Sequence, residues 1–121
     1  MTTIAKDSLV DRCIDECLQC VRACAACADE CLTTDPAKMA ECIRLCHECI
    51  EICKPCATLL AGSSRFAHQI CGVCADMCDA CAAECEKYGD VETMRTCAQA
   101  CRRCAKTCRE VAKAGPIRKA A

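Results

Sequence analysis

Large aromatic side chains are almost missing from this sequence of 121 residues, which contains one Phe, one Tyr and no Trp. Aromatic side chains usually supply much of the apolar area in a protein core. Hydrophobic residues nevertheless make up 54% of the chain, and its 20 cysteines are counted among them. Reduced cysteine behaves as a small hydrophobic side chain. We therefore expect cysteines to fill the core of a chain that is long enough to form one domain.

The sequence also lacks an excess of charge of one sign and any long apolar run. Its 16 basic and 17 acidic residues give a formal net charge of -1, which argues against nucleic acid or an anionic membrane surface as a partner. No segment has the length and apolarity of a signal peptide or a membrane-spanning helix. We expect a cytosolic protein with reduced thiols, because a secreted disulfide scaffold would not need helically spaced cysteines.

The cysteines recur at the spacing of packed helices. Between Cys13 and Cys31 the gaps alternate between four and three residues, which is the repeat of a helix that packs against other helices. The same alternation returns in three later segments, so the chain repeats one helical unit four times. The cysteines are Cys13, Cys17, Cys20, Cys24, Cys27, Cys31, Cys42, Cys46, Cys49, Cys53, Cys56, Cys71, Cys74, Cys78, Cys81, Cys85, Cys97, Cys101, Cys104 and Cys108.

Short turns separate the four units, and they contain residue types that begin or end helices. These residues are Asp35-Pro36, Gly62, Gly89-Asp90 and Gly115-Pro116. We predict helices over residues 8–32, 36–61, 65–88 and 91–114 of a single domain, 1–121. Short connections make consecutive helices antiparallel. The predicted fold is therefore all-α, an up-down-up-down antiparallel four-helix bundle with a cysteine-lined core.

Two features of the predicted helices do not follow from the cysteine repeat. Pro55 lies inside the second helix, where we expect a bend that keeps the cysteine register. A second apolar stripe runs beside the cysteines of the first helix and consists of Ile14, Leu18, Val21, Ala25, Ala28 and Leu32. This stripe either packs against neighbouring helices or forms a contact between copies of the chain, and we slightly favour the second interpretation.

Soft-metal binding explains the cysteine pattern better than core packing alone, because all 20 cysteines lie on one face of each helix. Thiolate is the ligand preferred by Cu(I), Zn²⁺ and iron–sulfur clusters. Residues four apart on a helix lie on the same side, one turn apart. Each of the nine C-x3-C pairs, such as Cys13 and Cys17, therefore offers two sulfurs to one ion.

Charge distinguishes between these metals. Zn²⁺ held by four thiolates leaves two uncompensated negative charges, and no Lys or Arg lies on the cysteine face to balance them. Cu(I) gives neutrality at one ion per thiolate and accepts two or three sulfur ligands. The empty protein keeps neutral thiols and releases protons on loading. We therefore predict storage of many Cu(I) ions, on the order of ten to twenty, and no enzymatic activity.

Two other functions stay open. One is a thiol redox-buffering protein, because seven C-x2-C pairs are present and such pairs occur in redox motifs. However, no pair is distinguished from the rest and no strand pattern accompanies them. The other is a zinc or mixed-metal sequestration protein. An iron–sulfur protein is disfavoured, since no C-x2-C-x2-C run occurs.

The two ends of the predicted bundle differ in the residues that extend the cysteine face. One end has Val10, Leu60, the Phe66-Ala67 region and Val111, and the other has Thr34, Met39, Tyr88 and Met94. Thioether sulfur is a weak, soft Cu(I) ligand, so we predict a metal entrance at Met39 and Met94 and a plug at the other end. The alternative is that these methionines only fill space. His47 and His68 lie beside the cysteines, and we expect both at the surface.

Four cysteine-lined helices with repeated C-x3-C pairs resemble the cytosolic copper storage proteins, a family of cysteine-rich four-helix bundles. The resemblance extends over about residues 8–114. It implies storage of many Cu(I) ions inside the bundle, with all 20 cysteines as ligands. It also implies homo-oligomers of bundles, commonly tetramers, and an open end with Met or His ligands.

Overall fold

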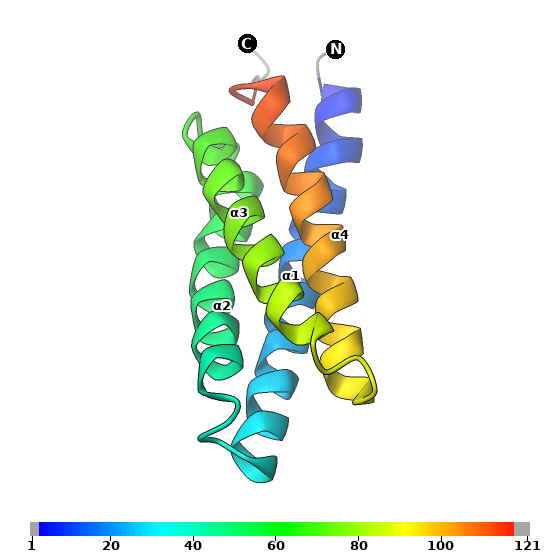
Figure 1. Ribbon diagram of the computed structural model, residues 1–121. Helices are drawn as coiled ribbons and strands as arrows, with labels where there is room; N and C mark the ends of the chain where they lie inside the picture. The colour runs from blue at the N-terminus through cyan, green and yellow to red at the C-terminus, as the bar shows by residue number, and fades with distance from the viewer. Residues whose placement is uncertain (1–2, 118–121) are drawn as a thin grey trace.

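The computed structural model describes residues 3–117, with side chains from Leu9 onward. Its four helices are α1 (Thr3–Thr34), α2 (Ala40–Ala61), α3 (Ala67–Glu86) and α4 (Glu92–Ala114), and no strand occurs among these residues. Consecutive helices run in opposite directions (Figure 1). Each helix packs against two neighbours, whereas the diagonal pairs α1/α3 and α2/α4 have no close backbone contact. This confirms the predicted all-α, up-down-up-down bundle.

The helix boundaries differ from the prediction mainly at the start of α1 and at the start of α2. α1 begins before residue 8, and α2 begins at Ala40 rather than at residue 36. Asp35 does act as a cap, because its Oδ1 accepts a hydrogen bond of 3.2 Å from the amide of Lys38. It caps a single separate turn over residues 36–39, and α2 starts only after that turn.

α2 continues through Pro55. The cysteines on either side of the proline, Cys53 and Cys56, are both completely buried. The predicted preservation of the cysteine register is therefore confirmed. Pro55 itself is exposed, so water can reach the carbonyl group that loses its usual hydrogen bond.

The second apolar stripe of α1 is partly packed inside the bundle and partly exposed, where it could form a contact between copies of the chain. Ile14, Val21 and Ala28 are half-buried and pack against the core. Leu18 and Leu32 stay 53% and 56% exposed. The first three residues recur every seven positions on one side of α1. Ala28 and Leu32 both line an outer groove with residues of α2, such as Ile43.

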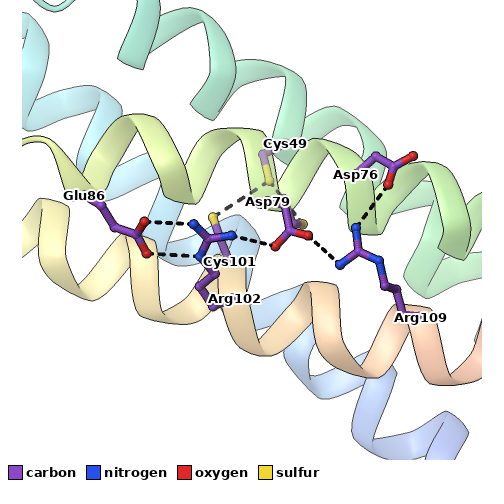
Figure 2. Close-up of polar contacts among 8 residues, drawn as sticks. Cys49, Asp76, Asp79, Glu86, Cys101, Arg102 and Arg109 are labelled. Carbon is purple, nitrogen blue, oxygen red and sulfur yellow. Dashed lines mark hydrogen bonds and ion pairs between the residues drawn. The ribbon is translucent and has the colours of Figure 1, made fainter.

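α3 and α4 approach each other through small side chains. Ala75 and Ala82 on α3 and Ala98 and Ala105 on α4 are all buried. Above this interface, on the outside, two arginines of α4 form ion pairs with acidic residues of α3 (Figure 2).

Asp79 connects the two arginines. It pairs with Arg102 at 3.0 Å and also with Arg109. Arg102 reaches Glu86 through two hydrogen bonds of 3.0 and 2.8 Å, and Arg109 reaches Asp76 at 3.1 Å. Asp79 is half-buried and the other four residues of the network are exposed. Each ion pair therefore contributes little to the stability of the fold. The network links the outer surfaces of α3 and α4.

The C-terminus of α2 ends in a Schellman motif. The amide of Ser64 donates to the carbonyl of Leu59 at 2.9 Å, and the amide of Ser63 donates to that of Leu60 at 3.1 Å. Ser63 has a φ of 54°, whereas Gly62 has a φ of -83°. The left-handed position is therefore held by a serine, one residue after the glycine that the sequence suggested.

We expect Ser63→Gly to stabilise the metal-free protein. Relief of the left-handed strain is worth about 1–2 kcal/mol, and the added flexibility of glycine in the unfolded chain offsets part of it, which leaves a net gain of about 0.5–1 kcal/mol. Urea unfolding followed by circular dichroism measures the change. Gly62→Ala is the matched control, because its Cβ would meet Thr58 O at an ordinary 3.5 Å. A loss of stability in Ser63→Gly would contradict the assignment of the strain to Ser63.

Candidate metal centre

All 20 cysteines are free thiols with no solvent-exposed surface. They come from all four helices, and the 3.5-residue repeat turns each cysteine face toward the common axis of the bundle. The predicted cysteine-lined core is therefore confirmed. The only buried polar side chain of another type in the described part of the chain is that of Thr107. No sequence pattern distinguishes Thr107, whose hydroxyl donates to the carbonyls of Arg103 and Cys104.

The sulfur atoms lie close together, and most close pairs join different helices. Examples are Cys49 and Cys78 at 3.4 Å, Cys13 and Cys108 at 3.5 Å, and Cys56 and Cys71 at 3.5 Å. Contacts also cross the diagonals of the bundle, as between Cys49 and Cys101 at 4.0 Å (Figure 2). The metal core is therefore assembled by tertiary packing.

Sulfur convergence within C-x3-C pairs is less common than the sequence predicted. Three of the nine pairs have sulfurs in contact, each at 3.9 Å: Cys20/Cys24, Cys74/Cys78 and Cys104/Cys108. Residues four apart are separated by about 6 Å along a helix axis, whereas facing helices place thiols in the same layer. Contacts between helices are shorter for this reason.

Several thiols form triangles, which suit an ion that takes three sulfur ligands. Cys20, Cys49 and Cys78 are separated by 3.6, 3.8 and 3.4 Å. Groups of four sulfurs within 4.8 Å of one another also occur and share members, so one thiolate could bridge neighbouring ions. The groups include Cys17/Cys74/Cys104/Cys108, Cys20/Cys53/Cys78/Cys104, Cys20/Cys24/Cys49/Cys101, Cys24/Cys81/Cys97/Cys101 and Cys27/Cys46/Cys85/Cys97.

The core contains no cation that could balance thiolate charge, because no Lys, Arg or His of residues 9–117 is buried. Hydrogen bonds from neighbouring thiols, first from Cys101, lower the pKa of Cys20. The neighbouring thiols keep their protons and have raised pKa values. The hydrogen bond with Cys101 is the main cause that raises the pKa of Cys24, and the hydrogen bond with Cys20 is the main cause that raises the pKa of Cys101. One thiolate can therefore form only while its neighbours stay protonated. Full deprotonation needs positive charge from a cargo.

The two ends of the core are closed by different residues. At the end near the chain termini (Figure 1), Val10, Leu60, Ala67 and Val111 are buried beyond the last cysteines. At the opposite end, Met39 and Met94 are both buried. Of their predicted neighbours there, Thr34 is exposed and Tyr88 is half-buried, with the ammonium of Lys38 5.9 Å from the centre of its ring.

The histidines lie outside the cysteine core. His47 is exposed, as expected, and lines an outer groove of about 550 Å³ with Leu32, Ile43 and Met77. His68 is half-buried rather than at the surface, and its Nδ1 has no hydrogen-bond partner. It occupies the first turn of α3, next to the apolar end of the core.

Comparison with known proteins agrees with this geometry. A family model described as copper storage protein matches residues 6–113. The chain belongs to the copper storage protein family. The resemblance expected from the cysteine pattern is therefore confirmed, and it extends over nearly the whole bundle.

Solved copper storage proteins share the fold of this family member. The apo form of copper storage protein 3 from Bacillus subtilis is 39% identical, with a TM-score of 0.77 over 84% of this chain and 97% of that one. The cytosolic copper storage protein of Streptomyces lividans, loaded with five coppers, is 35% identical, with a TM-score of 0.86 over 90% and 96%. YhjQ, a cysteine-rich protein of Bacillus subtilis strain 168, is 39% identical over 91 residues, 74% of this chain and 83% of YhjQ.

Proposed function

We propose that this copper storage family member holds many Cu(I) ions inside the bundle, bound by the thiolates of its 20 cysteines. The observation that carries this proposal is a core of free, buried thiols with no buried cation among residues 9–117. Only a monovalent soft ion neutralises such a core at one ion per thiolate. The protein acts by binding and release and is not an enzyme.

The same family membership supports a cytosolic role. The Streptomyces lividans relative is described as a cytosolic copper storage protein, and free thiols persist in a reducing compartment. Within residues 3–117, no helix is long and apolar enough to cross a membrane.

Anaerobic titration of the reduced protein with Cu(I), in competition with a chromophoric chelator, should saturate on the order of ten to twenty ions. Because the thiols of the empty core are protonated, loading should release about one proton per thiolate formed and should weaken as the pH falls. An indicator dye in weak buffer counts the protons. Zn²⁺ titrated in parallel is the comparison. Saturation at one or two Cu(I) ions, or tighter binding of Zn²⁺, would overturn the storage function.

We further propose that copper enters at the end closed by Met39 and Met94. Both thioethers are buried directly beyond the thiol core, where they can act as weak, exchangeable Cu(I) ligands. At the opposite end the side chains buried beyond the cysteines are aliphatic and provide no ligand, and the half-buried His68 lies beside them.

Replacing both methionines in the variant Met39→Leu/Met94→Leu should slow Cu(I) uptake about tenfold and leave the final capacity unchanged, since leucine preserves volume but has no sulfur. Stopped-flow mixing with a Cu(I)–chelator complex measures the rate. Met77→Leu, on the outside of α3, is the control. Uptake at the wild-type rate in the double variant would contradict the proposed entrance at this end.

The outer face of α1 is proposed as a contact between copies of the chain, within a homo-oligomer that the family resemblance suggests is a tetramer. Leu18 and Leu32 are more than half exposed there, and Leu32 borders the groove lined by Ile43 and Met77. Burying this apolar surface against a second copy would remove it from water.

The variant Leu18→Glu/Leu32→Glu should shift the protein toward smaller species in sedimentation-velocity runs, because charges would enter the proposed contact. Val73→Glu is the matched control, since Val73 is 50% exposed on α3. An unchanged oligomeric state in the double variant, or an equal effect of the control, would exclude this face as the interface.

A further inference from the structure

Cys31 differs from the other 19 cysteines in its sulfur contacts. Each of the others has at least one hydrogen-bonding sulfur contact within 4.0 Å. Cys31 has none, although it is a free thiol without any exposed surface. It is the last cysteine of α1, at the end of the bundle that holds Met39.

A triangle of thiols lies directly inside Cys31. Cys27 and Cys42 are 3.7 Å apart, Cys27 and Cys85 are 3.8 Å apart, and Cys42 and Cys85 are 3.7 Å apart. The three sulfurs come from three helices and are nearly equidistant, which suits one three-coordinate Cu(I) ion. Cys31 follows Cys27 by four residues and therefore lies one turn nearer the end on the same face.

Cys31 is also in electrostatic contact with this triangle. Burial is the main cause that raises the pKa of Cys31, and the neighbouring Cys42 and Cys27 raise it further. Cys31 is therefore a neighbour of the triangle, one helical turn beyond Cys27.

The opposite end has no equivalent thiol. Its outermost cysteines form close pairs, Cys13 with Cys108 and Cys56 with Cys71, each at 3.5 Å. Cys13 is the first cysteine of α1, as Cys31 is the last, and both are completely buried. Cys13 therefore has a sulfur partner at its end of α1, whereas Cys31 has none at the other end.

We propose that Cys31 is a transfer ligand, which takes each incoming Cu(I) ion and passes it to the site formed by Cys27, Cys42 and Cys85. This role rests on the proposed storage of Cu(I) and on its entrance at the same end. It assigns Cys31 a role in the rate of loading, in addition to its place among the 20 storage thiols.

Transfer proceeds by two ligand exchanges. In the first, a bond between Cu(I) and its donor breaks, a bond to the Cys31 sulfur forms, and the thiol proton leaves with the released donor ligand or with water. In the second, Cu(I) bonds to a thiol of the triangle, whose proton returns to Cys31 as the bond between copper and Cys31 breaks. Copper stays Cu(I), one proton is released per ion, and Cys31 is ready for the next ion.

The test compares Cys31→Ala with Cys13→Ala, which remove equivalent thiols from opposite ends of α1. Each variant is mixed anaerobically with a Cu(I)–chelator complex at a copper concentration far below capacity, and uptake is followed by stopped flow. Cys31→Ala should load about tenfold more slowly than wild type, and the slowing in Cys13→Ala, which also loses one storage thiol, should be much smaller. Equilibrium capacity should be nearly equal in the two variants.

Wild-type rates in Cys31→Ala, or equal slowing in both variants, would overturn the transfer role. If Cys31→Ala fails to fold by circular dichroism, Cys31→Ser replaces it, because serine is a small side chain of similar shape without a soft ligand. The wild-type protein tests the premise separately. Saturation of the wild type at one or two ions overturns storage itself, whereas high capacity with fast loading of Cys31→Ala overturns only the role of Cys31.

Discussion

Charge neutrality in a buried space is the constraint on which the rest of this structure depends. Twenty thiols share a core in which no side chain of the described part of the chain supplies a buried cation, so the empty protein must keep nearly all of them protonated. In that state the thiols are small apolar groups and the bundle folds around them as around an ordinary core. Copper can then replace protons one for one, and the total charge of the core does not change. Folding and storage therefore make the same demand on the interior.

The small size of cysteine and alanine explains how so many sulfurs come within contact distance. Alanines such as Ala75 and Ala98 let α3 and α4 approach closely, while larger residues such as Val21 and Ile50 pack at the outer edges of the core. The ion pairs of Arg102 and Arg109 lie outside this thin interface. Bulky core side chains would hold the helices further apart, and the sulfurs of facing helices would then not meet.

The cysteine repeat and the short turns between its four units were enough to predict the fold. The repeat alone predicted the burial of every thiol, because a 3.5-residue period turns one face of a helix toward its neighbours. Sulfur partners could not be predicted in the same way. They depend on how far each helix is shifted along its axis relative to the next helix. The cysteine spacing within one helix does not determine that shift. The start of α2 was misplaced since Asp35 caps a separate turn. Ser63 was missed because serine rarely adopts a left-handed conformation, and nothing near it in the sequence signals the exception.

Sulfur contacts between helices have a consequence for the mechanics of the protein. Cu(I) bound by Cys20, Cys49 and Cys78 would join three helices that the backbone connects only through turns. Every such ion is a reversible cross-link, and ligands that bind only the folded state stabilise it by mass action. The bundle would therefore stiffen as it fills and soften as it empties. Copper deep in the bundle would become the most firmly held part of the store, and retrieval would begin with the ions nearest the end.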